Sequence, residues 1–151
     1  QDLVAKGWCL LNANRPQEAA AAFEKGRNAK GDDSSYGQAL SMLRSGETDA
    51  AAAVGERVAS PKKRQDLGLQ VLAQRAVAAN RAGRYVEVLH YLDQRAAFSG
   101  ETRDMSMMRG WALWNLGRKD SARRIFNELD RQLSTNETQT ALGVVNEVRG
   151  N

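Results

Sequence analysis

The sequence repeats itself, and this internal repetition constrains its fold more than any other feature does. The segments Lys6–Gly26 and Arg109–Leu129 align without a gap. They share seven identical residues: Gly7/Gly110, Trp8/Trp111, Leu10/Leu113, Asn12/Asn115, Arg15/Arg118, Ala19/Ala122 and Phe23/Phe126. Chance would give about one match over a window of this length. Two weaker copies lie between them, at Tyr36–Val58 and Ala73–Arg95. The chain is therefore predicted to be an array of similar units.

Each copy has the same internal order of residue types. A helix with a small residue near its middle leads, about seven residues later, to a residue that tolerates a left-handed turn: Asn14, Gly46, Gly83 or Gly117. These turn residues are 32, 37 and 34 positions apart. A second helix follows, and its apolar residues repeat at a spacing of four, so they share one helical face: Ala19 and Phe23, Val88 and Leu92, Ala122 and Phe126. The pattern predicts four helix–turn–helix pairs.

Helix pairs of about 34 residues resemble the tetratricopeptide repeat family, and the resemblance covers about residues 2–133. It implies an all-α fold, a right-handed α-solenoid of about four repeats whose first helices line a concave groove. We expect a single domain over residues 1–151, with repeats at 2–31, 33–60, 61–100 and 102–134 and a terminal helix at 136–149. Because the chain opens at Gln1 in a helical pattern without an initiator Met, we expect it to be part of a longer protein.

Two features depart from the family pattern. Most units lack the Pro that usually ends them, and the second and third turn residues are 37 positions apart. The extra length falls at Ser60 and Pro61, which are a good N-cap and a good first helical residue. The helix that follows is therefore predicted to be long, over Pro61–Ala82.

Carrying the family's groove geometry over to the first helices gives a set of candidate partner-binding residues. They are Trp8, Leu11, Asn12, Tyr36, Leu40, Arg44, Val77, Asn80, Arg81, Met107, Trp111, Trp114 and Asn115. All three tryptophans of the chain are among them. Aromatic residues beside Arg and Asn are typical of protein-binding surfaces. A structural interpretation stays open, because Trp8 and Trp111 occupy equivalent positions and could simply pack adjacent units together.

The innermost groove positions are mostly apolar, with Val4, Trp8, Tyr36 and Leu40. Members of the family that hold a chaperone's terminal carboxylate carry Lys, Arg and Asn there instead. The resemblance therefore favours an extended or helical segment with apolar contacts as the ligand. Asn12, Arg44, Asn80, Arg81 and Asn115 could hydrogen-bond the ligand's backbone, or could form only a solvated rim.

The residues for catalysis and metal binding are scarce. The chain has one cysteine, Cys9, and one histidine, His90, which excludes an intrachain disulfide and leaves no basis for a metal site. These two residues are 81 positions apart in different repeats, and we interpret Cys9 as a small packing residue beside Trp8. No phosphate-binding, dinucleotide-binding, zinc-protease or hydrolase motif is present. We therefore expect no enzyme activity and no cofactor.

Charge and hydropathy exclude further classes. The net charge of +4, from 22 basic and 18 acidic residues, is mild and spread along the chain, so nucleic-acid binding is not expected. An RNA-binding helical repeat would need a recurring polar pair at one site per unit, and the neighbours of Asn12, Arg44, Arg81 and Asn115 are mostly apolar. No apolar run in the sequence approaches the roughly 18 residues of a membrane-spanning helix.

The sequence thus predicts a non-catalytic scaffold that binds a protein or peptide in its concave groove. Its Ala-, Arg- and Gln-rich composition looks bacterial, and many bacterial proteins with such repeats serve envelope assembly or exopolysaccharide secretion. The resemblance therefore extends to a role of that kind, with the periplasm favoured over the cytoplasm. Three alternatives stay open: a structural spacer, a regulatory arm of a larger enzyme, and an RNA-binding helical repeat.

Overall fold

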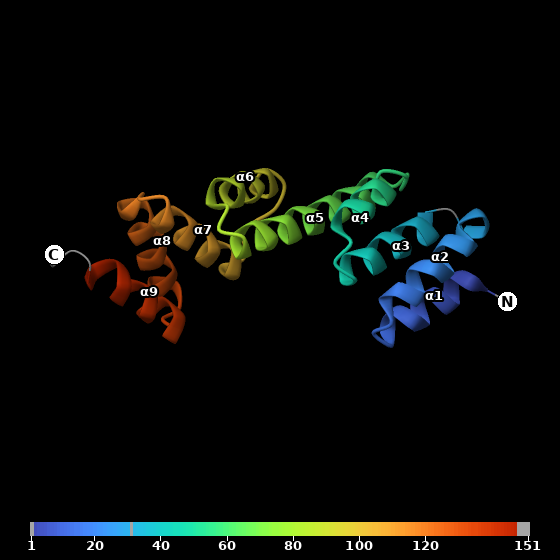
Figure 1. Ribbon diagram of the computed structural model, residues 1–151, viewed down its shortest axis with the longest axis horizontal. Coiled ribbons are helices and arrows are strands. Elements are labelled where there is room, and N and C mark those ends of the chain that lie inside the picture. The colour runs from blue at the N-terminus through green and yellow to red at the C-terminus, as the bar shows by residue number, and fades with distance from the viewer. Residues whose placement is uncertain (1, 31, 148–151) are drawn as a thin grey trace. The chain divides into compact units, whose positions relative to one another are not determined.

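The computed structural model describes residues 2–30 and 32–147 (Figure 1). Within these ranges the chain forms nine helices and no strand, which confirms the all-α prediction. The helices are α1 Leu3–Asn12, α2 Pro16–Lys30, α3 Asp32–Arg44, α4 Thr48–Gly55, α5 Pro61–Arg81, α6 Tyr85–Ala96, α7 Arg103–Asn115, α8 Lys119–Gln132 and α9 Asn136–Glu147. Residue 31 of the first expected repeat and residues 148–149 of the expected terminal helix lie outside the described residues.

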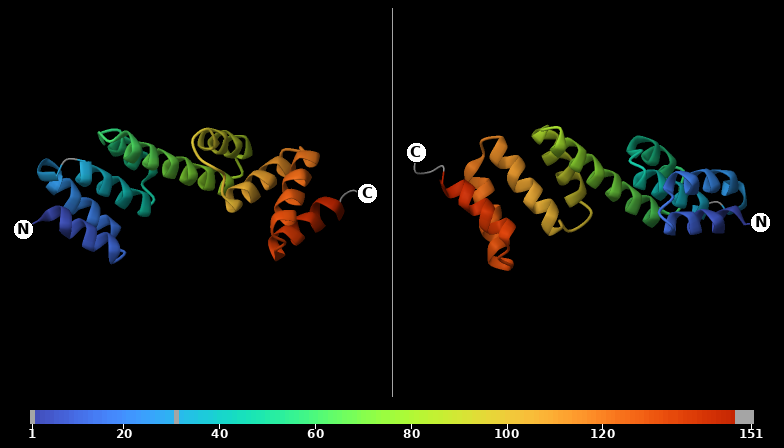
Figure 2. Two further views of the ribbon diagram at one scale, coloured as in Figure 1. Left: turned by 180° about the vertical axis from the view of Figure 1, so that it is seen from behind. Right: turned by 60° about the horizontal axis from the view of Figure 1, so that its bottom comes forward.

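Two compact units divide the chain, unit 1 over Gln1–Gln74 and unit 2 over Arg75–Asn151. In unit 1, α2 packs against α1 and α3, and α3 packs against α4. In unit 2, α7 packs against α6 and α8, and α8 packs against α9 (Figure 2). Within each unit these helices therefore contact their neighbours in chain order, which is consistent with a tetratricopeptide-like solenoid. The predicted boundaries of the individual repeats stay a prediction.

The long helix α5 begins at Pro61, where the sequence predicted a helix start. The backbone amide of Lys63 donates a hydrogen bond to Ser60 Oγ over 3.4 Å, as an N-cap requires. The helix ends at Arg81, one residue before the predicted end. The boundary between the two units falls inside it, between Gln74 and Arg75.

All four predicted turn residues have a positive φ: 60° for Asn14, 81° for Gly46, 73° for Gly83 and 82° for Gly117. Each ends a helix with the same pair of backbone hydrogen bonds. After α3, the Glu47 amide donates to the Met42 carbonyl over 2.9 Å, and the Gly46 amide donates to the Leu43 carbonyl over 3.1 Å. This pairing satisfies the last carbonyls of the helix and reverses the chain. The repeated turn therefore sets up the helix pairs.

Glycine and phenylalanine pack against each other inside the helix pairs. A Cβ atom on Gly110 would lie 2.5 Å from Phe126 Cε1, and one on Gly7 would lie 2.8 Å from Phe23 Cδ1. Both phenylalanine side chains are fully buried. The rings thus occupy the space that the glycines leave on the neighbouring helix, which lets the two helices approach closely.

The apolar cores lie between consecutive helices. In unit 1 one core cluster surrounds Phe23 and a second surrounds Val58 and Leu67. In unit 2 one cluster surrounds Val88 and Leu92, and another surrounds Phe126. The second of these includes Ala141 and Val145 of α9, so the terminal helix covers the apolar side of α8.

Candidate protein-binding surface

In unit 1, Trp8 of α1 has both a packing contact and a polar partner. Its ring meets Phe23 edge-on, with ring centroids 4.9 Å apart and an interplanar angle of 76°. Its indole Nε1 donates a hydrogen bond to Asp33 Oδ2 over 3.2 Å. Leu40 of α3 packs against the same core cluster, so Trp8 and Leu40 are brought together. Both side chains remain partly exposed.

The C-terminal ends of α1 and α3 each accept a hydrogen bond from the first helix of the next repeat. Arg44 Nη1 donates a hydrogen bond to the Leu11 carbonyl over 3.1 Å. Gln74 Nε2 of α5 donates to the Leu43 carbonyl over 2.6 Å. Leu11 and Leu43 are equivalent in the repeat, so these contacts link successive first helices at equivalent points. The side chain of Leu11 itself is buried in the core, whereas the neighbouring Asn12 is exposed.

Tyr36 links α3 to α5. Its hydroxyl donates a hydrogen bond to Asp66 Oδ2 over 2.8 Å, and Lys63 Nζ lies 5.6 Å from the centre of its ring. Burial and the bond to the Asp66 carboxylate raise the pKa of the Tyr36 phenol, so the hydroxyl stays a donor at neutral pH. The ring is half-buried, with a cation within reach of its π-face.

In unit 2, α7 carries two tryptophans in different settings. Trp111 lies against Phe126, with ring centroids 4.9 Å apart, and so repeats the Trp8–Phe23 contact. Trp114 packs against the same cluster, and Lys119 Nζ lies 5.2 Å from the centre of its ring. Asn115 is exposed, and its amide donates to the Trp111 carbonyl over 2.8 Å. Met107 is buried in the core.

The remaining candidates lie near the end of α5. Val77 and Asn80 are half-buried, and Arg81 in the last turn is exposed. The alanines at positions 76 and 79 of the same helix are buried against Val88 and Leu92. Val77, Asn80 and Arg81 thus flank the core contact of α5 and do not form it.

The structure therefore divides the predicted residues into two groups. Leu11 and Met107 are core residues with no surface for a partner. The others form what we call the first-helix face of each unit: Trp8, Asn12, Tyr36, Leu40 and Arg44 in unit 1, and Val77, Asn80, Arg81, Trp111, Trp114 and Asn115 in unit 2. Such a mixture of half-buried rings and exposed amide or guanidinium groups suits polypeptide recognition.

One sequence-based interpretation is wrong. Cys9 is exposed, and is not a buried packing residue beside Trp8. On a helix, adjacent residues point about 100° apart, so a neighbour of a half-buried residue can face solvent. The described residues contain no group of His, Cys, Asp and Glu side chains that could hold a metal ion. No described helix combines the length and the apolar character needed to cross a membrane.

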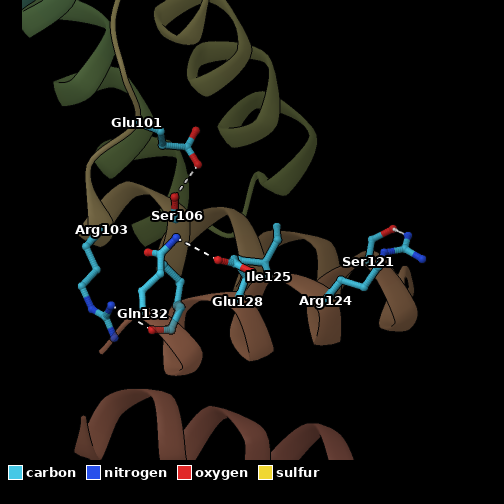
Figure 3. A pocket seen from close by; sticks show the side chains of 9 residues that line it. Glu101, Arg103, Ser106, Ser121, Arg124, Ile125, Glu128 and Gln132 are labelled. Carbon is cyan, nitrogen blue, oxygen red and sulfur yellow. Dashed lines mark hydrogen bonds between the residues drawn. The ribbon is translucent and has the colours of Figure 1, made fainter. Parts of the chain in front are cut away.

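Sequence reasoning missed a cavity of about 530 Å³ in unit 2, which α8 and the start of α7 form (Figure 3). Its lining residues are Glu101, Arg103, Ser106, Ser121, Arg124, Ile125, Glu128, Leu129 and Gln132. The α8 members follow the spacing of one helical face, which is the signal that the sequence offered.

Comparisons with known proteins agree with this fold. Residues 4–66 and residues 107–128 each match a family model described as tetratricopeptide repeat, and the two matches together cover more than half of the chain. A solved structure titled MamA AMB-1 has 20% sequence identity and a TM-score of 0.66, over 98% of this chain and 81% of that one. A structure titled MamA MSR-1 also has 20% identity, with a TM-score of 0.59 over 98% of this chain and 85% of the other. No curated protein matches the chain.

Proposed function

Because the chain belongs to the tetratricopeptide repeat family, we propose that it is a non-catalytic scaffold that binds a peptide or protein segment through its first-helix faces. The supporting observation is on α7. Trp111 and Trp114 stand half-buried beside the exposed Asn115, and the amide oxygen of Asn115 is free to accept a hydrogen bond because its nitrogen is the donor to Trp111. Partly exposed aromatic rings next to hydrogen-bonding groups are where interfaces concentrate their binding energy.

Site-specific photo-crosslinking tests this proposal. A photoreactive amino acid replaces Asn115 in the protein, and the cross-linked product is identified by mass spectrometry. We expect one specific protein adduct, because a ligand on this face would lie within reach of position 115. Substituting Trp114 by Ala in the same protein should remove the adduct.

The matched control places the photoreactive group at Asn127, which is exposed on the second helix α8 and does not line the cavity. The proposal predicts no specific adduct from position 127. Equal adducts from positions 115 and 127, or no adduct from position 115 in the native host, would contradict binding through the first-helix face.

We also propose that the protein serves bacterial envelope assembly or exopolysaccharide secretion. This placement is supported only by the composition and the family resemblance of the sequence. Cell fractionation tests it: the tagged protein should be recovered with the envelope and periplasm. Recovery in the cytoplasmic fraction alone would overturn the placement, but would leave the scaffold proposal intact.

A structural spacer is the second candidate function, and a specific observation favours it. Trp8 and Trp111 each have a ring contact with a buried phenylalanine of the second helix, so their presence needs no ligand. For a spacer, substitution of Trp114 would leave every interaction of the protein unchanged. The photo-crosslinking experiment therefore distinguishes the two candidates.

A further inference from the structure

The cavity of about 530 Å³ in unit 2 is separate from the residues of the first-helix faces. One wall is a stripe along α8, at Ser121, Arg124, Ile125, Glu128 and Gln132 (Figure 3). The other wall comes from Glu101, Arg103 and Ser106, at the start of α7 and just before it. A cavity of this size matches those that hold small ligands or a few side chains.

The two carboxylates of the lining already have cationic partners. Glu101 accepts hydrogen bonds from Arg109 Nη2 over 2.8 Å and from Ser106 Oγ over 2.7 Å. Glu128 accepts from Arg131 Nε over 3.1 Å and from Gln132 Nε2 over 3.0 Å. Burial acts to raise the pKa of Glu101, but the bonds from Arg109 and Ser106 outweigh it and lower the pKa. Both groups are therefore charged and paired at neutral pH.

The two guanidinium groups of the lining are bonded mainly to neutral acceptors. Arg103 donates to the Leu129 carbonyl over 3.0 Å and also to the Leu133 carbonyl. Arg124 donates to Ser121 Oγ over 3.2 Å. Asp130 Oδ1 accepts hydrogen bonds from the hydroxyls of Thr138 and Ser134. These bonds, and to a smaller extent the charge of Arg103, lower the pKa of Asp130. Among the described residues neither arginine forms an ion pair, so both guanidinium groups can still donate to an anionic ligand.

Apolar surface lies between these two cations. Ile125 is partly exposed, and Leu129 lines the cavity while also belonging to the core cluster around Phe126. Figure 3 shows Ile125 on α8 between Arg124 and the Glu128–Gln132 pair. A ligand that fills the cavity would therefore place an aliphatic group against Ile125 and an anionic group near Arg103 or Arg124.

We propose that this cavity binds an acidic segment of a partner polypeptide, in which an Asp or Glu carboxylate stands next to an aliphatic side chain. The carboxylate would accept charge-assisted hydrogen bonds from Arg124, whose present partner is a neutral hydroxyl that is easily exchanged. The inference extends the proposed scaffold function by adding a second contact surface, distinct from the first-helix face, and by naming the chemistry of its ligand.

Titration of the isotope-labelled 151-residue chain, followed by NMR, tests the proposal. The probe is the acetylated and amidated peptide Leu-Glu-Leu-Glu, raised to about 10 mM because a short peptide is expected to bind in the millimolar range. We expect saturable shifts of the signals of Arg103, Arg124 and Ile125, and weaker binding at higher salt. The neutral peptide Leu-Gln-Leu-Gln is the matched probe and should give no saturable shift.

Variants locate the site and separate the two proposals. Arg124→Gln should raise the Kd of the acidic peptide about fivefold, which corresponds to about 1 kcal/mol. Arg118→Gln removes the same charge from an exposed position outside the cavity and should leave the Kd unchanged. Asn115→Ala, on the first-helix face, should also leave it unchanged, so this proposal and the scaffold proposal fail independently.

The inference would be overturned by equal shifts with the neutral peptide, by equal weakening of binding in Arg118→Gln and Arg124→Gln, or by no saturable shift of the lining residues at the highest peptide concentration. The same titration is repeated with inorganic phosphate in place of the peptide. If phosphate alone reproduces the shifts at the same concentration, the cavity is a general anion site, and the assignment to an acidic polypeptide is wrong.

Discussion

Phe23 and Phe126 fill space that exists only because the residues facing them have no side chain. The matching contact in each unit involves a glycine on the first helix and a fully buried ring on the second. Close packing leaves little room for even one added methyl group in such a site. The residue pairs that the repeat alignment singled out therefore control how closely the two helices of a pair approach.

Gly110→Ala is expected to destabilise unit 2. The new Cβ would lie 2.5 Å from Phe126 Cε1, and overpacking of this kind costs about 1–3 kcal/mol. Gly143→Ala is the matched control, because a Cβ at this helical position meets nothing within 4 Å and should stabilise by up to about 1 kcal/mol. Urea denaturation measures both. A stabilising effect of Gly110→Ala would contradict the packing described here.

At the residue scale, the turn positions and the Gly–Phe pairs were predictable from the sequence. Backbone conformation at Gly46 or Gly117 depends on local residue type, and the spacing of four places Ala122 and Phe126 on one face. The bond from Trp8 to Asp33 was not predictable, because it depends on the rotation of α3 against α1. The exposure of Cys9 was mispredicted for a related reason: proximity in sequence to Trp8 does not fix which way a helical side chain points.

Between elements, Arg109 is the main ionic link of unit 2. It lies on α7, contacts Asp93 of α6 over 2.7 Å and forms a paired contact with Glu101 in the segment that joins the two helices. The side chains of Arg109 and Glu101 are each only 20% exposed, so solvent screens their interaction less than that of a surface pair. This link fixes the segment that forms one wall of the cavity.

Glu101→Gln is expected to cost about 1–2 kcal/mol at pH 7, because it leaves the half-buried Arg109 without the carboxylate that accepts hydrogen bonds from both its Nε and its Nη2. The cost should depend on pH. The folded-state pKa of Glu101 lies below its ordinary value of 4.5, so the carboxylate contributes stability above that value and loses it as the pH falls through the folded-state pKa. Urea midpoints at several pH values should show wild type and variant converging below about pH 4.5. A difference that stays constant with pH would contradict this role.

The terminal helix α9 gives another test at the scale of elements. Val145 is fully buried against the Phe126 cluster, whereas its neighbour Val144 is 36% exposed. Val145→Ala should destabilise unit 2 by about 1–3 kcal/mol, and Val144→Ala by less than about 1 kcal/mol. Thermal or chemical unfolding of the two variants checks the difference. Equal effects would show that α9 does not pack on α8 as described.

The individual helices could be predicted from the sequence more readily than the surfaces that the helices form together. Pro61 marked the start of α5 because its ring suits the first turn of a helix. The cavity of unit 2 was not predicted from the sequence. It depends on how the segment around Glu101 and the start of α7 lie against α8. Its lining combines residues up to about 30 positions apart, and the repeat alignment gives no information about such a combination.

For the molecule as a whole, the scaffold proposal predicts that binding and stability respond to different tryptophans. Trp114→Ala should weaken binding of the partner identified by cross-linking by about 1–4 kcal/mol, as measured by calorimetry. Leu116→Ala, at an exposed position on the same side of the turn, should change the affinity by less than about 0.5 kcal/mol. If Trp114→Ala leaves the affinity unchanged, the array is a spacer.

The packing of Phe23 limits which amino-acid substitutions the chain can accept during evolution. Its ring lies against Gly7 of α1 and also against Gly37 of α3, where an added Cβ would come within 2.4 Å of Cζ. One side chain thus sets the approach of two helices from two successive repeats. A larger residue at position 7 or 37 becomes acceptable only in a background where position 23 has already become smaller. The effects of mutations at these three sites should therefore be strongly non-additive.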